Sequence, residues 1–284
     1  MATQVGNAGS KQKCVKIGGA VGFWGESDAA LPQFLRHDDI DYIVFDYLAE
    51  ITMSIMARAK AADPAKGYAI DFVTQVLRTH IREVAAQDIK IIANAGGVNP
   101  EACAGAIRTL LSSLGVSRKV GVVLGDDLFH RRDILAERGI QEMFRQTPFP
   151  QSDKIASINA YLGAFPIAEA LRRGADIVVT GRCVDSALTL GPCIYEFGWT
   201  RDDVDALAGG SLAGHIIECG PQATGGNFTD WEDVSDGLAD IGYPIAHIRA
   251  DGGFAITKAA NTGGVVSTAS VGEQMLYEIG DPSA

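Results

Sequence analysis

The chain has 284 residues, of which 47% are apolar, so it can bury the core of one large domain or two smaller ones. Its 35 acidic residues outnumber its 24 basic ones, and the net charge of −11 disfavours binding to nucleic acid or to an anionic membrane. No apolar run reaches the roughly 20 residues that cross a bilayer, and residues 1–14 lack the apolar centre of a signal peptide. We therefore expect a flexible leader and a cytoplasmic protein.

The first two-thirds of the chain alternates short apolar runs with helical patterns, which is typical of parallel α/β structure. Three helices between the strands have clear signals. The first has Ser27 as its N-cap, and the second has apolar residues at helical spacing. The third has Asn99 as its N-cap, Pro100 at its first position and Gly115 at its end. We predict these helices at residues 26–37, 70–87 and 99–115, and strands at residues 15–22, 42–47, 89–95, 119–125 and 175–181.

The composition of the sequence changes near residue 205, where glycine becomes frequent. Short apolar runs at 215–220, 246–250 and 264–270 alternate there with turns. We expect a parallel α/β domain over residues 15–204. Residues 205–284 then form a glycine-rich α+β lobe that completes the cleft, or an elaborated end of the same sheet. The leading architecture is a mostly parallel, doubly wound, Rossmann-like sheet, and the alternative is an incomplete β/α barrel.

Polar residues follow the predicted strands at the point where each one ends. Ligands of open parallel sheets bind at these carboxyl ends, so convergence of the set favours a site, although loop and N-cap roles explain any single residue. We expect Arg182 to face the cleft, and Asp185 or Ser186 to cap the helix that follows. The set comprises Asp46, Glu50, Asn94, Asn99, Asp126, Asp127, Arg182, Asp185 and Ser186.

Cofactor motifs are missing from the sequence. It lacks G-x-G-x-x-G after a strand, the Walker lysine motif and the G-x-S-x-G elbow, so we expect no nucleotide cofactor and no serine nucleophile. We also expect no bound metal; a divalent cation near Asp126, Asp127 or His130 is the alternative. The five cysteines have neither disulfide nor metal spacing and are expected to be reduced, with Cys183 or Cys219 as a less favoured nucleophile.

A Thr-Gly-Gly unit occurs twice, at residues 224–226 and 262–264. Paired glycines let successive backbone N–H groups point at an anion, which would suit a carboxylate or an oxyanion. The alternative is a tight turn between short strands.

Five motifs together resemble the acyclic terpene utilisation protein A family: "NAGGVNP" (94–100), "GRCVDSALTLGP" (181–192), "ECGPQATGGN" (218–227), "GYPIAHIRADGGFAITKAANTGG" (242–264) and "LYEIGDP" (276–282). The resemblance runs from about residue 16 to the end of the chain. It implies a cytoplasmic protein that works with acyl-CoA pathways for terpenes and branched acids. It also implies a small ferredoxin-like unit, either further along the chain or on another polypeptide.

The motif positions supply the candidate site residues, and their roles are our physical assignment. We assign catalysis to Asp185, Glu218 and Lys258. The predicted substrate-binding residues are Asn94, Gly96, Gly97, Asn99, Arg182, Ser186, Gln222, Thr224, Gly225, Gly226, Asn227, Asp251, Thr262, Gly263 and Gly264.

These residues predict a hydratase or C–C lyase that acts on a branched carboxylic acid or an acyl-CoA thioester. Arg182 would clamp a carboxylate, Asp185 or Glu218 would move a proton, and Lys258 would anchor an anion or act as a base. Gly-Gly turns, with Asn94 or Asn227, would donate hydrogen bonds to an enolate oxygen. The alternative is a non-catalytic subunit that binds an acyl-CoA or organic acid and docks the ferredoxin-like partner. In either case we expect a homo-oligomer.

Overall fold

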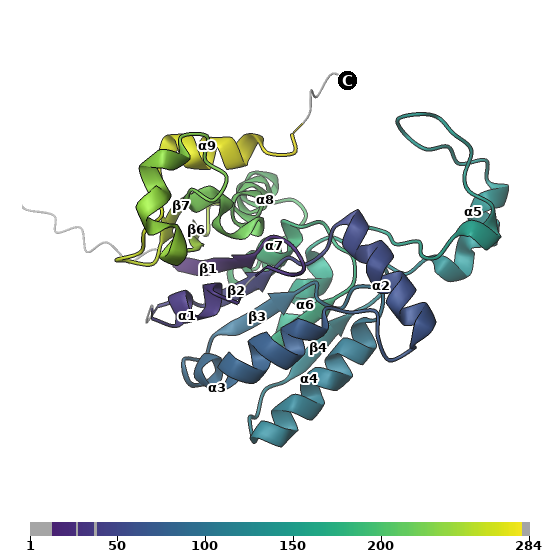
Figure 1. Ribbon diagram of the computed structural model, residues 1–284, viewed down its shortest axis with the longest axis horizontal. Coiled ribbons are helices and arrows are strands. Elements are labelled where there is room, and N and C mark those ends of the chain that lie inside the picture. Colours follow the sequence, from purple (N-terminus) through teal and green to yellow (C-terminus); the bar gives the residue numbers. More distant parts are fainter. Residues whose placement is uncertain (1–12, 27, 37–38, 280–284) are drawn as a thin grey trace, which may run out of the picture.

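The computed structural model describes residues 13–26, 28–36 and 39–279. Seven strands form one sheet in the order β4-β5-β3-β2-β1-β6-β7 (Figure 1). The five strands from β1 to β5 are parallel to one another, whereas β6 is antiparallel to both β1 and β7. The strands are β1 (Cys14–Val21), β2 (Tyr42–Phe45), β3 (Lys90–Ala93), β4 (Val120–Val123), β5 (Ile177–Thr180), β6 (Pro244–Arg249) and β7 (Phe254–Lys258). The mostly parallel α/β sheet is thus confirmed.

Helices cover both faces of the sheet, which explains why the central strands are apolar at successive positions. Ile43 and Ile91 face one core, which contains α1 (Ala30–Leu35), α2 (Glu50–Ala62), the π-helical segment η1 (Phe72–Leu77), α3 (Arg78–Ala86) and α4 (Pro100–Leu114). Val44 and Val178 face the other core, which contains α6 (Phe165–Arg172), α7 (Ala187–Phe197) and α8 (Val204–Glu218). The Rossmann-like winding stays a prediction.

The predicted helices differ from the observed ones mainly at their ends. The first begins only at Ala30, and its predicted N-cap Ser27 lies outside the described residues. The second is a π-helical turn that continues into α3. The third is confirmed as α4, which ends at Gly115 with a left-handed φ of 66°. Glycine is favoured there because it has no Cβ to clash in that conformation.

Two of the three apolar runs noted in the C-terminal part are not strands. Residues 215–220 include the end of α8, and residues 264–270 contain no strand but lead into α9 (Thr268–Leu276), whose N-cap Ser267 accepts a hydrogen bond from the Ser270 N–H. The run at 246–250 is confirmed as part of β6, and β6 and β7 extend the same sheet. Two short 3₁₀ segments, η4 (Gly220–Thr224) and η5 (Trp231–Asp240), lie between α8 and β6.

A long excursion separates β4 from α6 and projects from the body of the molecule, as the segment around α5 shows in Figure 1. We call residues 127–160 the arm. It contains η2 (Phe129–Arg131), α5 (Arg132–Glu137) and η3 (Ser152–Lys154), and none of its residues is buried. Among the described residues, no helix combines the length and the hydropathy that a bilayer crossing requires.

Candidate functional site

The carboxyl ends of β5, β3 and β2 are adjacent, because these strands are parallel neighbours in that order. Arg182, Asn94 and Asp46 follow them, so the sheet brings together three residues that are far apart in the chain. All three are at most 5% exposed. This edge of the sheet is therefore the candidate site.

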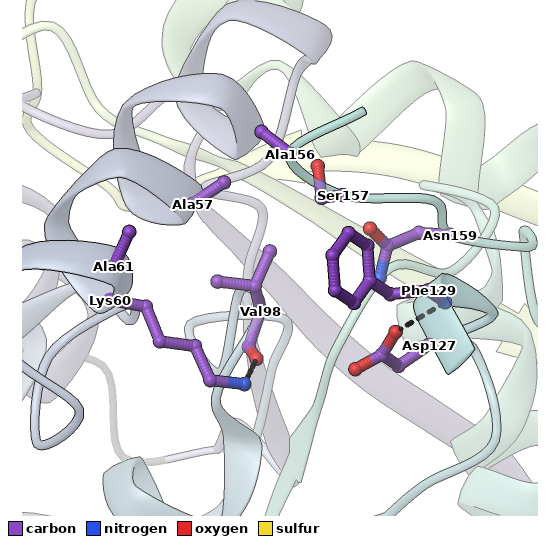
Figure 2. Close-up of a pocket in the computed structure, with 9 residues that line it drawn as sticks. All are labelled: Ala57, Lys60, Ala61, Val98, Asp127, Phe129, Ala156, Ser157 and Asn159. Atoms are coloured by element: carbon purple, nitrogen blue, oxygen red, sulfur yellow. Dashed lines mark hydrogen bonds between the residues drawn. The ribbon is translucent and has the colours of Figure 1, made fainter. Parts of the chain in front are cut away.

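A cavity of about 240 Å³ lies beside this edge, between α2 and the base of the arm (Figure 2). Its walls include Ala57, Ala61, Val98 and Phe129, and the Lys60 ammonium donates a hydrogen bond to the Val98 carbonyl (2.6 Å). Small apolar walls with a few polar groups are typical of ligand pockets. Ala57 lies two turns beyond Glu50 at the start of α2, about 10 Å along the helix.

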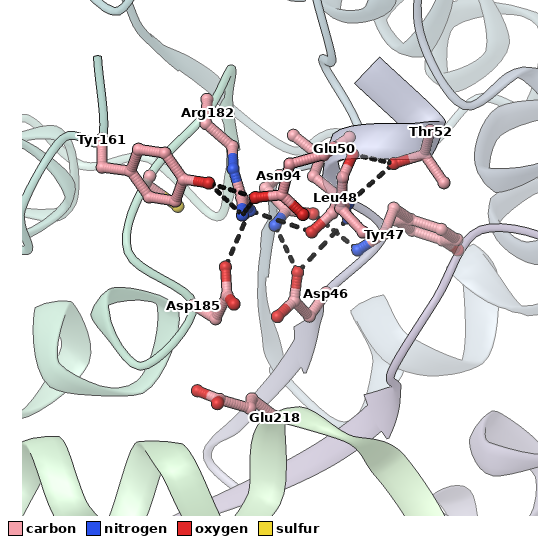
Figure 3. A network of polar contacts seen from close by, with 12 residues as sticks. Asp46, Tyr47, Leu48, Glu50, Thr52, Asn94, Tyr161, Arg182, Asp185 and Glu218 are labelled. Atoms are coloured by element: carbon pink, nitrogen blue, oxygen red, sulfur yellow. Dashed lines mark hydrogen bonds and ion pairs between the residues drawn. The ribbon is translucent and has the colours of Figure 1, made fainter. Parts of the chain in front are cut away.

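Arg182 is the centre of a polar network (Figure 3). Its Nη1 donates to the Leu48 carbonyl (2.9 Å) and to Asp185 Oδ1 (2.8 Å), and its Nη2 donates to the Tyr161 hydroxyl (3.0 Å). The Tyr161 hydroxyl in turn donates to Glu50 Oε1 (2.5 Å). The expectation that Arg182 faces the cleft is wrong, since its side chain is only 6% exposed and its guanidinium is directed at the chain's own oxygen atoms.

Asn94 fixes the second part of the network. Its Nδ2 donates to Asp46 Oδ1 (2.5 Å), and its Oδ1 accepts from the Tyr47 N–H (2.7 Å). Both ends of the amide are therefore occupied, and Asn94 positions Asp46.

Three carboxyl groups, of Asp46, Asp185 and Glu218, lie on the same side of Arg182 and Asn94 in Figure 3. Burial raises the pKa of Asp46 well above its ordinary value, and the nearby Asp185 carboxylate raises it further. Burial also raises the pKa of Asp185, although Arg182 acts in the opposite direction. Like charges held close in a poorly solvated place cannot all ionise readily, so these carboxyl groups keep their protons to higher pH than isolated carboxyl groups do.

Glu218 shares a proton with His215, one turn earlier on α8. The His215 Nδ1 lies 3.0 Å from Glu218 Oε1, and its Nε2 lies 3.2 Å from the Met275 carbonyl, which can only accept. Nε2 therefore carries a hydrogen, and one further proton lies between Nδ1 and Glu218. Burial raises the pKa of Glu218, and its hydrogen bond raises the pKa of His215.

Asp126 supports the network from β4 and the arm. Its Oδ2 accepts from the Arg182 backbone N–H and from Asn159 Nδ2, both at 2.8 Å. Asp127 Oδ1 accepts from the Phe129 N–H. Within the part of the chain that the structure describes, no group of three or more His, Cys, Asp or Glu side chains could hold a metal ion.

Neither expected capping role at α7 is observed. Ser186 occupies the N-cap position but makes no side-chain capping hydrogen bond, and the Asp185 carboxylate accepts from Arg182. Asn99 at the start of α4 likewise makes no cap: its amide donates to the carbonyls of Pro64 and Lys66. Helix capping therefore does not explain why an aspartate stands at position 185.

The Gly-Gly turns do not present free donors to an anion, as the sequence had suggested. In the turn at 96–97, in the Thr-Gly-Gly unit at 224–226 and in the one at 262–264, all six glycine N–H groups donate to backbone carbonyls. The two Thr-Gly-Gly units instead meet, with the Val265 N–H donating to the Thr224 carbonyl (2.9 Å). Gln222 and Asn227 flank the first unit, and Gln222 Oε1 is buried without a partner among the described residues.

Two predicted residues lie away from the carboxyl cluster. Lys258 ends β7, three strands from β2, and its ammonium donates to the Thr262 carbonyl and hydroxyl (2.8 Å each). Asp251 lies in the turn after β6, at the opposite end of the sheet, because β6 is antiparallel to β1. Burial lowers the pKa of Lys258, but the structure does not bring this residue together with Asp185 and Glu218.

All five cysteines are free thiols, as expected. Burial raises the pKa of Cys183 and of Cys219 to about 12. The thiolate that a nucleophile requires is therefore scarce at neutral pH.

Five residues of the network were not among the predicted catalytic or substrate-binding residues: Asp46, Glu50, Asp126, Tyr161 and His215. Asp46, Glu50 and Asp126 did belong to the polar set at the strand ends, which was the available signal. His215 was missed because the run that contains it was not recognised as helical. Only in a helix does the i,i+3 spacing of His215 and Glu218 predict that their side chains meet. Tyr161 directly follows the arm, and no motif or periodicity in the sequence indicated that it belongs to the site.

The fold and the site define an α/β protein with a cluster of carboxyl groups of raised pKa, buried or half-buried, at the carboxyl edge of its sheet. The chain belongs to the acyclic terpene utilisation family: the family model described as acyclic terpene utilisation family protein AtuA matches residues 15–283. Membership links the chain with acyclic terpene utilisation. Comparison with curated proteins and with solved structures yields no match.

Proposed function

We propose that the chain is a lyase, a hydratase or C–C lyase, which acts on a branched carboxylic acid or its acyl-CoA thioester at the carboxyl edge of the sheet. The observation that carries the proposal is the cluster of Asp46, Asp185 and Glu218, whose pKa values burial raises. Carboxyl groups with raised pKa values can both accept and donate protons near neutral pH.

In the dehydration direction, Asp185 takes the proton from the carbon beside the carbonyl. The Glu218–His215 pair gives its proton to the departing hydroxyl, which leaves as water while the C=C bond forms. Asp46, held in its neutral form, donates a hydrogen bond to the substrate carbonyl as negative charge develops on that oxygen. Hydration runs the same steps in reverse.

The cavity beside α2 supports an apolar branched substrate. Its walls at Ala57, Ala61 and Val98 are small, and the same helix begins at Glu50 in the polar network. An extended substrate could thus place its carbonyl near Asp185 and its chain along α2.

The test is turnover by Asp185→Asn and Glu218→Gln against a panel of branched acids and their CoA thioesters, with product masses showing gain or loss of water or cleavage. We expect each variant to lose about 10²- to 10⁴-fold in kcat while keeping its circular dichroism spectrum. Asp251→Asn, at the other end of the sheet, is the matched control. Unchanged turnover in Asp185→Asn would eliminate its role as the base.

The second candidate function is a non-catalytic subunit that binds an acyl-CoA or organic acid and works with a small ferredoxin-like partner. The observation that favours it concerns Arg182. Its guanidinium is directed at the chain's own oxygen atoms, so it is not available to clamp a substrate carboxylate. Ligand-induced thermal stabilisation without turnover, in the presence and absence of the partner, would support this function over the lyase.

A further inference from the structure

The arm carries apolar side chains that its own chain does not cover. Ile134 and Ile140 are 55% and 41% exposed, and Met143 and Phe144 at the tip are 75% and 82% exposed. No residue of the arm is buried. Exposed apolar side chains gathered on one projecting segment are typical of a surface that is covered by a partner.

The tip of the arm is a preformed hairpin. The Phe149 N–H donates to the Ile140 carbonyl (3.0 Å), and the Glu142 N–H donates to the Thr147 carbonyl (2.9 Å). The Glu142 carboxylate accepts from the N–H groups of Phe144 and Arg145, which fixes the turn. The backbone that carries Met143 and Phe144 is therefore held by hydrogen bonds within the arm, which lowers the entropic cost of association.

A hollow of about 360 Å³ lies at the base of the same arm, next to α2. Ser54 of α2 forms one wall, and Phe149, Pro150, Ile155 and Ile158 of the arm form the apolar remainder. Phe149 at the base of the hairpin is a wall of this hollow, whereas the tip residues Met143 and Phe144 do not line it. An aromatic side chain from another molecule can fill it.

We propose that the arm is the contact surface for a second copy of this chain, with Phe144 of each copy inserted into the hollow beside α2 of the other. One chain carries both the projection and the hollow, so a two-fold axis creates two identical contacts at once. This proposal is independent of the lyase activity.

Charge also favours a second copy. The arm contains five basic and five acidic residues, whereas the whole chain has 24 and 35. The arm therefore has no net charge on a strongly acidic molecule, and one copy can approach another through it with little repulsion.

The test is the mass of the full chain in solution, measured by light scattering after gel filtration. We expect the wild-type chain to be a dimer at micromolar concentration, and Phe144→Asp and Ser54→Trp each to be monomers. The first removes the projection, and the second fills the hollow. Val204→Asp, which changes an apolar residue that is 66% exposed on α8, is the control and should remain dimeric.

A mixture of the two monomeric variants gives the sharpest result. The Phe144→Asp chain retains its hollow and the Ser54→Trp chain retains its projection, so together they should form a heterodimer with one contact. A monomeric wild-type chain, a dimer that survives Phe144→Asp, or a mixture that does not associate would each overturn the proposal. Circular dichroism spectra of both monomeric variants that match the wild-type spectrum show that the fold is intact.

Discussion

At the scale of single residues, Arg182 organises the site. It makes an ion pair with Asp185, donates to Leu48 and Tyr161, and lies with its guanidinium carbon 4.2 Å from the centre of the Tyr161 ring. A guanidinium is suited to this position because it has five donors in a rigid plane and stays charged. Its burial is thus offset by partners from three separate segments of the chain.

We expect Arg182→Met to lower the free energy of unfolding by about 3 kcal/mol, because it leaves the half-buried Asp185 carboxylate without its cation and the Leu48 carbonyl without its donor. Urea unfolding measures the change. Arg173→Met, which removes an exposed ion pair with Glu169, is the control and should have little effect. Equal losses in the two variants would mean that the Arg182 network does not support the fold.

At the scale of elements, the two Thr-Gly-Gly units join η4 to the segment before α9. A Cβ at Gly264 would collide with the backbone oxygens of Ile241 and Thr224. Glycine is required there by the close approach of two backbone segments, and this explains the motif without a ligand.

We expect Gly264→Ala to destabilise the fold by about 2 kcal/mol, because neither backbone oxygen can move aside cheaply. Gly272→Ala is the matched control: it lies within α9, no atom lies within 4 Å of the added Cβ, and alanine should stabilise the helix by about 0.5 to 1 kcal/mol. Thermal unfolding of both variants gives the comparison. A neutral Gly264→Ala would contradict the close approach.

At the scale of the whole molecule, the buried carboxyl groups link stability to pH. Because burial raises the pKa of Asp46 in the folded state above its ordinary value of 3.8, the folded state holds this proton more tightly than the unfolded chain does. Its contribution to stability is complete below that ordinary value and is lost as the pH rises towards the folded-state pKa.

We therefore expect Asp46→Asn, which mimics the neutral carboxyl group, to gain stability relative to the wild-type chain as the pH rises above about 4. Melting temperatures of both chains between pH 4 and pH 8 measure the difference. Asp202→Asn, which changes an exposed residue, is the control. A difference that stays constant with pH would mean that Asp46 titrates alike in the folded and unfolded chains.

The sequence by itself determined the five parallel strands, α4 with its glycine end, and the polar residues that follow the strands. The strands and α4 follow from local periodicity. The convergence of the polar residues follows from the rule that the carboxyl ends of parallel strands lie at one edge of a sheet. It also supplied the motifs that indicate the family, which the match over residues 15–283 shows.

The tertiary structure decided which of those polar residues meet. Arg182 is buried among residues from other segments of the chain, and Tyr161 contacts Glu50 of another segment. The sequence shows no periodic relation between these segments. Only His215 and Glu218, which share a proton, are related by a helical turn, in α8. It also showed that the Gly-Gly turns use their N–H groups internally. Hydrogen-bond partners and desolvation depend on what packs around a group, and local sequence does not contain that.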